Sequence, residues 1–498
     1  MSKCAVWLAF CLLLSNFSLL TPGGYAQDQP VASPAAASAT PPAGEAGGHD
    51  DHAALGARLP LWTILPFAAL LLCIAILPLA AGHWWEHNTN KAWVAGALAA
   101  VVAIYLAAVW RDAGIEALSH VLLEYLSFIL LLGALFIITG GIHVTGSLSG
   151  TPLANTGLMA LGAVIANVIG TTGASVLLVR PLLRANQSRQ NKVHIVIFFI
   201  FIVSNCGGLL TPLGDPPLFM GFMAGVPFEW TLLNLWPQWL LVNLVLLVLF
   251  HVWDEVVFAR EEKKRPGSQL EEVLKNEPVG LRGGLNFLFL AGVVAAVYCK
   301  GVYNWPWGVQ EGIMASMAVL AYLTTAPANR TANKFSFGPI VEVAVLFVGI
   351  FITMTPALQI LNAWGSGHRE VLGMGFGMSE PWQFFWATGG LSSFLDNAPT
   401  YITMAATAAG MEQVASEGQY LREFLATGES AAKLLAAISC GAVFMGANTY
   451  IGNGPNFMVK AIAEENGVRM PSFFGYMAYS GMVLIPIFVL VTLIFFSG

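Results

Sequence analysis

Long apolar stretches alternate with short polar segments along this chain, from residue 61 almost to the C-terminus. Most of them approach or exceed the roughly 20 residues that a helix needs to cross the hydrocarbon core of a bilayer. The pattern predicts an all-α polytopic membrane protein with about ten transmembrane helices. The predicted spans are residues 61–80, 91–110, 120–143, 193–224, 231–253, 281–300, 308–326, 339–362, 434–460 and 474–496.

Two further apolar regions, residues 153–183 and 381–410, are each interrupted near the middle by small and polar residues. Non-helical backbone at membrane depth is tolerated only where protein or a water-filled cavity buries it. We therefore predict two re-entrant hairpins, each of which enters and leaves the membrane on one side.

The positive charges agree with this arrangement. If the mature N-terminus lies outside, 15 Lys and Arg residues fall in inside loops and six fall outside, as the positive-inside rule requires. The division depends on both hairpins being re-entrant. It predicts a multi-pass protein of the bacterial inner membrane with both termini in the periplasm.

The predicted elements occur twice in the same order. Residues 120–253 give a helix, a hairpin (153–183), a broken helix (193–224) and a helix, starting outside, and residues 339–498 give the same order (hairpin 381–410, broken helix 434–460), starting inside. Two such units form an inverted-topology repeat, which in secondary transporters encloses a substrate site near the bilayer midplane. The other predicted parts are peripheral helices (58–119 and 281–338) and a cytoplasmic linker loop (254–280).

A duplicated motif marks the two broken helices. Residues 211–219 are TPLGDPPLF and residues 449–457 are TYIGNGPNF, so that Asn453 takes the place of Asp215. Pro and Gly break helices and free backbone groups, and matched breaks in two halves of a membrane protein indicate a transporter binding site. Two ordinary helix kinks are the plainer explanation, but the duplication extends beyond these nonamers.

The hairpin tips, NVIGTTGAS (167–175) and SSFLDNAPT (392–400), carry small polar side chains. Aligned with each other, they match Asp396 with Thr171, Asn397 with Thr172 and Thr400 with Ser175. Hard cations prefer such oxygen ligands, whereas helix N-termini at the same breaks attract anions. The predicted ion-binding residues are Asn167, Thr171, Thr172, Ser175, Asn205, Thr211, Gly214, Asp215, Asp396, Asn397, Thr400, Asn448, Thr449, Gly452 and Asn453.

Two carboxylates indicate whether the substrate is positively or negatively charged. An aspartate at the bilayer centre costs at least ~2.5 kcal/mol on insertion scales and is usually functional, so we predict Asp215 and Asp396 as sodium ligands. The alternative is that each carboxylate caps a half-helix. Neither hairpin tip and neither nonamer contains Lys or Arg, which favours a cation over citrate.

Composition excludes several other classes. The 498 residues are 56% hydrophobic and 10% charged, far below the roughly 25% charged residues of a soluble domain, so the bilayer is the expected partner and nucleic acid is not. The sequence has no Gly-x-Ser-x-Gly and no His-Glu-x-x-His, and we predict no enzymatic activity and no cofactor.

The N-terminus has the pattern of an export signal. Lys3 precedes an apolar core and Gly24-Tyr25-Ala26 supplies small residues for cleavage, so residues 1–26 are predicted to be a signal peptide. An additional transmembrane helix is the alternative. Residues 27–57, rich in Ala, Pro, Ser and Gly, are predicted to be a disordered periplasmic tail.

Four segments together resemble the ion transporter superfamily: SNCGGLLTPLGDPPLF (204–219), NVIGTTGAS (167–175), SFLDNAPT (393–400) and GANTYIGNGPNF (446–457). Within it, they look most like the D-type bacterial sodium/proton antiporters and the neighbouring citrate transporters. The antiporter pattern Asn-Gly-Gly-x-x-Thr-Pro-x-Gly-Asp reappears here with Cys206 inserted. Pro216-Pro217, after Asp215, differs from the antiporter members.

The resemblance covers residues 60–498 and implies a homodimer with a scaffold domain and a moving transport domain. It implies exchange of sodium ions for protons, both as transported species. The alternative is a carrier of citrate or another small carboxylate, coupled to protons or sodium. The Ser-Asn-Thr signature of the dicarboxylate carriers is not clearly present at either hairpin tip.

Overall fold

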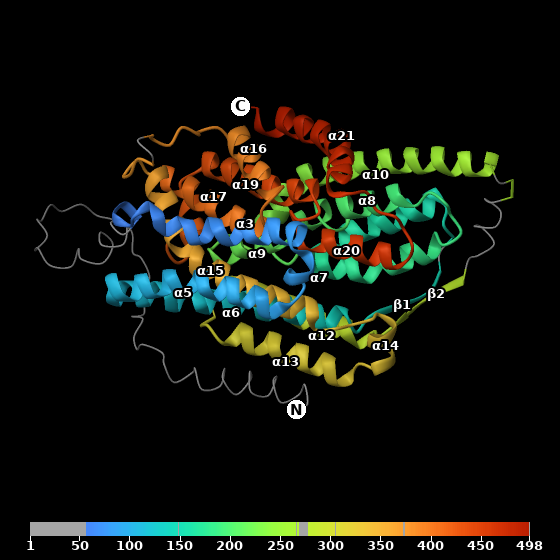
Figure 1. Cartoon of the computed structure of the whole chain (residues 1–498), viewed down its shortest axis with the longest axis horizontal. Coiled ribbons are helices and arrows are strands. Elements are labelled where there is room, and N and C mark those ends of the chain that lie inside the picture. Colours follow the sequence, from blue (N-terminus) through green and yellow to red (C-terminus); the bar gives the residue numbers. More distant parts are fainter. Residues whose placement is uncertain are drawn as a thin grey trace, which may run out of the picture. The chain divides into compact units, whose positions relative to one another are not determined.

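The computed structural model describes residues 56–147, 149–264, 266–267, 277–303, 305–371 and 374–497. The predicted signal peptide and almost all of the predicted tail lie outside these residues. Within the described ranges, nine helices are long and apolar enough to cross a membrane. Figure 1 shows most of the long helices running side by side along one direction. A polytopic, mainly helical membrane protein is therefore confirmed.

The first helices follow the predicted spans closely. They are η1 (Leu61–Ile64), α3 (Leu65–Ala80), α4 (Gly82–Trp85), α5 (Asn88–Val109) and α6 (Arg111–Thr139). The last of these begins at Arg111 rather than at residue 120. Its apolar part packs against α15 (Gly338–Gly365), which also contacts α5. Phe128 of α6 stacks on Phe347 of α15 with ring centroids 4.9 Å apart.

Helix α7 (Pro152–Ala185) doubles back on itself where the hairpin 153–183 is predicted. Gly170 has a φ of 78° and interrupts the helical backbone, in a region that side chains other than Gly rarely adopt. The two ends of α7 lie side by side: the Nδ2 atom of Asn186 donates to Oδ1 of Asn155 at 2.7 Å. The region 381–410 forms two helices, α16 (Pro381–Ser392) and α17 (Asn397–Met411), which pack on each other.

The two predicted broken helices are both broken. Helix α8 (Val193–Ile202) leads through η2 (Cys206–Leu209) to α9 (Pro216–Met223), and α19 (Glu429–Met445) leads through η3 (Gly446–Asn448) to α20 (Gly454–Glu465). The chain crosses itself tightly at each break: a Cβ on Gly214 would lie 2.1 Å from the Gly208 carbonyl, and one on Gly452 would lie 2.7 Å from the Gly446 carbonyl. Glycine is required at both crossings.

Helix α10 (Trp230–Lys264) runs beyond its predicted end at residue 253. The predicted linker 254–280 is therefore helical over its first 11 residues. Buried ion pairs explain the extension: Arg189 binds Asp254 at 2.7 Å and Glu261 at 3.5 Å. The first part of the predicted loop is therefore a helix that two buried carboxylates anchor to Arg189.

The remaining elements include a short antiparallel ribbon that the sequence pattern does not predict. Strand β1 (His143–Ser147) pairs with β2 (Glu277–Arg282), far apart in sequence. The other helices are α12 (Leu285–Tyr303), α13 (Val309–Thr324), α14 (Pro327–Ala332), α18 (Tyr420–Ala426) and α21 (Phe473–Val491), which continues into η4 (Thr492–Phe496).

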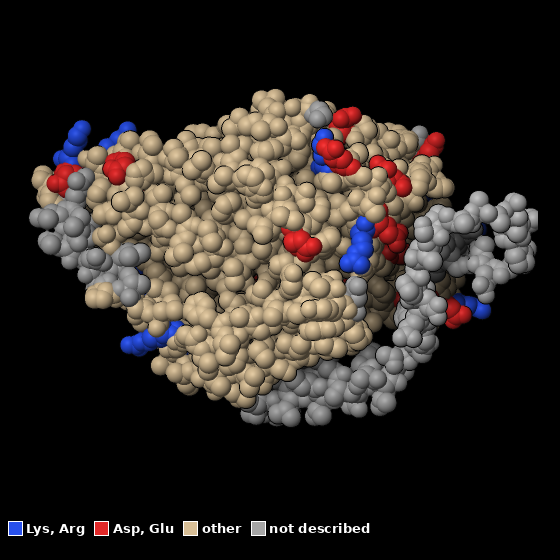
Figure 2. Space-filling view, turned by 180° about the vertical axis from the view of Figure 1, so that it is seen from behind, with Lys and Arg blue, Asp and Glu red and all other residues tan. Residues whose placement is uncertain are grey.

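The surface is consistent with a lipid environment. Figure 2 shows charged side chains gathered towards the two ends of one face, with a broad uncharged stretch between them. Large apolar side chains such as Leu233, Leu323 and Phe474 are more than 60% exposed. Exposed large apolar side chains of this kind are typical of a membrane-facing surface.

Candidate functional site

The centre of the candidate site is the carboxylate of Asp215, which is 1% exposed. Three side chains donate to it from three different elements. The hydroxyl of Thr171 at the bend of α7 and the amide of Asn453 before α20 donate to Oδ1 at 2.8 and 3.1 Å. The amide of Asn397, the first residue of α17, donates to Oδ2 at 2.6 Å. We call these four residues the Asp215 cage.

A chain of asparagines extends from the cage and joins the two broken helices. Asn453 also donates to Oδ1 of Asn205 at 3.1 Å. Asn205 donates to Oδ1 of Asn456 at 2.7 Å, and Asn456 donates to the Gly446 carbonyl at 2.8 Å. The sequence analysis did not single out Asn456, although it is a buried polar residue within the second nonamer.

The two nonamers make the same contact with the two hairpin tips. The hydroxyl of Thr211 donates to the Asn167 carbonyl, and that of Thr449 donates to the Ser393 carbonyl, both at 2.5 Å. The Asn167 amide donates to the Gly207 carbonyl at 2.7 Å. These residues fasten the hairpin tips to the broken helices and do not contact the Asp215 carboxylate.

The two aspartates have different surroundings. Asp215 occupies the N-cap position of α9, yet its side chain makes no capping hydrogen bond there. Asp396 caps α17 by accepting from the Ala398 amide at 3.1 Å, and its carbonyl accepts from the Thr400 hydroxyl at 2.9 Å. The capping alternative therefore describes Asp396 and not Asp215.

The alignment of the hairpin tips is shifted by one residue at the site. The residues that reach Asp215 are Thr171 and Asn397, whereas the sequence alignment matches Asn397 with Thr172. The two tips turn differently, the first at Gly170 with its positive φ and the second through Ser393 to the Asp396 cap. An alignment by sequence order alone does not show that the two tips turn at different positions.

The other predicted residues lie around the cage in supporting positions. The Ser175 hydroxyl lies 2.7 Å from that of Ser204, and the Gly214 carbonyl accepts from the Thr171 amide at 2.8 Å. Asn448 donates to the Ser393 hydroxyl at 2.8 Å, and Gly452 donates to the Thr449 hydroxyl at 3.1 Å.

A small cavity of about 90 Å³ gives access to the cage. Thr172 and Asp215 form part of its wall, and side chains of α6 and α15, including Leu135 and Ile340, form the rest. The cavity is large enough for a few water molecules or a small ion.

Within the described ranges, the carboxylate in the cage has no cationic side chain beside it. Among the described residues no Lys, Arg or His pairs with Asp215, and its three donors are neutral. A buried ionised carboxylate without a compensating charge is costly, so that a proton or a bound cation is favoured there. In the same part of the chain no three His, Cys, Asp or Glu residues cluster as a metal site, which leaves hydroxyl, amide and backbone oxygens as further ligands.

Comparison with known proteins identifies a family. A family model described as "Putative citrate transport" matches residues 56–496. No curated protein matches the chain. The family match bears out the resemblance to citrate transporters and does not bear on the resemblance to sodium/proton antiporters.

Proposed function

This chain belongs to the family described as "Putative citrate transport", and from that premise we propose that it is a secondary-active transporter in which Asp215 exchanges a proton for a sodium ion. The observation that carries the proposal is the Asp215 cage, a fully buried carboxylate with three neutral donors and no cationic partner among the described residues.

The cage suits two alternative occupants. A proton on Asp215 removes its charge, and a sodium ion beside it compensates the charge. Asn397 and Asn453 donate their amide nitrogens to the carboxylate, and rotation of each amide would present its oxygen to a cation instead. Because sodium binds the ionised carboxylate, sodium and protons compete.

The repeated contacts support an alternating-access design. We propose that α7 and the pair α16–α17 are re-entrant hairpins, and that residues 120–253 and 339–498 form an inverted-topology repeat around the cage. The matched contacts of Thr211 and Thr449 with the hairpin tips support this proposal. By the resemblance noted above, the working unit is a homodimer in the bacterial inner membrane.

A second candidate is transport of citrate or another small carboxylate together with a sodium ion or proton at Asp215. The family description favours it. Citrate carries about three negative charges at neutral pH, and the cage offers no Lys or Arg to balance them. The coupling cation would have to supply that balance.

Transport assays in proteoliposomes separate the two candidates. With the purified protein, added sodium should release protons, and the apparent sodium affinity should weaken as the pH falls. Labelled citrate should not be taken up either with or without sodium. Citrate uptake that depends on this protein, in either condition, would reverse the order of the candidates, and Asp215→Asn serves as the inactive control for both assays.

A further inference from the structure

A second and larger pocket lies at the other end of α9. It has a volume of about 390 Å³ and is lined by α6, the end of α9 and the segment after it, the end of α12, the start of α13 and residues 418–422. At 1.5 Å per residue, the eight residues of α9 put about 12 Å between this pocket and Asp215. Its volume is typical of small-molecule sites, and it is separate from the Asp215 cage.

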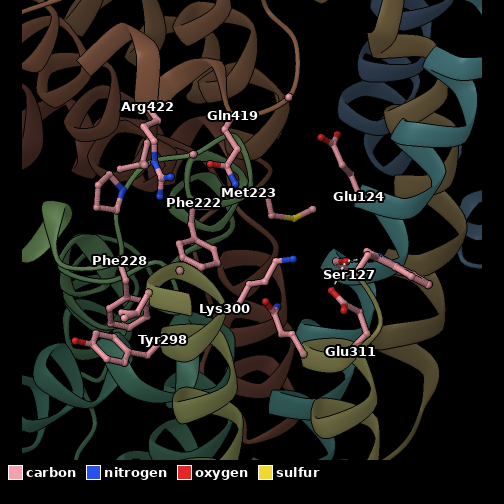
Figure 3. Close-up of a pocket in the computed structure, with 18 of the residues that line it drawn as sticks. Glu124, Ser127, Phe222, Met223, Phe228, Tyr298, Lys300, Glu311, Gln419 and Arg422 are labelled. Carbon is pink, nitrogen blue, oxygen red and sulfur yellow. Dashed lines mark hydrogen bonds between the residues drawn. The ribbon is translucent and has the colours of Figure 1, made fainter. Parts of the chain in front are cut away.

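Two cationic side chains enter this pocket from different walls. Figure 3 shows the Lys300 amine reaching into the open centre and the Arg422 guanidinium extending towards Phe222. The Lys300 amine donates to the Trp305 carbonyl, which carries no charge. Within the described ranges neither Lys300 nor Arg422 forms an ion pair with a carboxylate. In this part of the chain, the two cations of the pocket therefore have no direct ionic partner.

Three carboxylates, those of Glu124, Glu229 and Glu311, also line the pocket, and none of them contacts Lys300 or Arg422 directly. Glu311 accepts from the Ser127 hydroxyl at 2.6 Å and from the Gly308 amide at 2.8 Å. Glu124 pairs with His120 at 3.3 Å, and Glu229 is exposed. The two cations are thus available to a negatively charged ligand.

A buried amide adds a polar contact. Gln310 lines the pocket and is 3% exposed. Its amide nitrogen has the Met314 sulfur as its acceptor, at 3.9 Å, and a thioether is a weak acceptor. An oxygen of a ligand would be a better partner. Replacing the sulfur by a ligand oxygen would stabilise the complex, because a buried polar group with a weak hydrogen-bond partner is costly.

We propose that this pocket binds a small di- or tricarboxylate through Lys300, Arg422 and Gln310, at a site distinct from the Asp215 cage. Charge-assisted hydrogen bonds between such cations and carboxylates are strong, and the volume fits a molecule of this size. The charge asymmetry of the sequence puts both cations on the predicted periplasmic side, where a dissolved substrate would arrive. The ligand class rests on the carboxylate candidate of the proposed function, whereas the two-cation pocket does not.

Citrate binding to the purified full-length protein tests the proposal by isothermal titration calorimetry. We expect Lys300→Gln and Arg422→Gln each to weaken citrate binding about tenfold or more, the change expected when a charge-assisted contact is lost. The charge-preserving Lys300→Arg and Arg422→Lys should retain most of the affinity, which controls for folding. Lys433→Gln is the matched control, because Lys433 is an exposed cation of the same predicted side, paired with Glu429 at 3.1 Å.

The Asp215→Asn variant separates this proposal from the proposed function. It should bind citrate with unchanged affinity even if it transports nothing. Citrate binding that is lost in Asp215→Asn but retained in Lys300→Gln would overturn the proposal and place the ligand in the cage. Because a lipid phosphate has similar anionic chemistry, the same variants should be compared in nanodiscs with and without phosphatidylglycerol. Lys300-dependent binding of that lipid, with no citrate binding, would equally overturn the proposal.

Discussion

At the scale of single residues, the structure separates two aspartates that the sequence leaves equivalent. Both Asp215 and Asp396 precede a half-helix within an apolar region, and either could bind a cation or cap the helix. Which of these two roles each aspartate takes depends on whether its side chain reaches a backbone amide of the following helix. The local sequence does not determine this contact. The carboxylate of Asp396 accepts from a backbone amide of its own helix, whereas that of Asp215 accepts only from side chains of other elements.

Asp215→Asn should abolish sodium-dependent proton release while leaving the protein folded. The substitution removes the ionisable group but keeps a side chain of similar shape, whose oxygen can still accept hydrogen bonds from the cage. The measurement is proton release in proteoliposomes, with thermal unfolding in detergent as the folding control. Near-normal exchange by Asp215→Asn would show that this carboxylate does not carry the transported ion.

Asp396→Asn should keep most of the transport activity, because Asn caps a helix about as well as Asp. Asp396→Ala should lower the stability by about 1 kcal/mol, the usual value of a lost N-cap, since the Ala398 amide loses its acceptor. Both effects can be read from thermal unfolding and from the assay used for Asp215. If Asp396→Asn is as inactive as Asp215→Asn at full stability, then Asp396 is a ligand, as predicted from the sequence.

At the scale of elements, the sequence predicted the membrane helices well because hydrophobic length leaves few alternatives in a bilayer. It also indicated the interruptions of the helical backbone at Gly170 and between the paired helices α8–α9 and α19–α20, since Gly, Pro and small polar residues are conspicuous there. It missed the β1–β2 ribbon, whose strands are distant in sequence. It also missed Asn456, because the residue that matches it in the first nonamer is the apolar Leu218, so that the comparison of the two nonamers does not single it out.

Gly214→Ala should disrupt the first break and with it the cage. The added Cβ would lie 2.1 Å from the Gly208 carbonyl oxygen, so the backbone next to Asp215 would have to move. Overpacking of this kind usually costs about 1–3 kcal/mol or more. Gly157→Ala in α7 is the matched control, because a Cβ there meets nothing within 4 Å and Ala is the better helix former. If Gly214→Ala and Gly157→Ala had equal thermal stability and equal transport, the close approach of Gly214 to Gly208 would be contradicted.

At the scale of the whole molecule, the inverted repeat requires the chain to be threaded through the membrane in one particular way. The structure puts the two ends of α7 side by side through the Asn155–Asn186 pair. If α7 lies within the membrane, both of its ends must therefore emerge on the same face. That geometry supports the charge argument, which counted residues 180–192 as inside only because this segment was taken to turn back.

Single cysteines at two exposed positions would test this threading. In a background with the native cysteines replaced, Gln187→Cys follows α7 and Ala426→Cys lies near the end of α18; both positions are exposed in the structure. We expect a membrane-impermeant maleimide applied to intact cells to label Ala426→Cys and to label Gln187→Cys only after the cells are opened. The physical reason is the excess of Lys and Arg in the loops predicted to be cytoplasmic. Labelling of both positions from the same side would remove the inverted repeat. The Asp215 cage would then have to reach both sides of the membrane by a motion other than the exchange of two symmetry-related conformations.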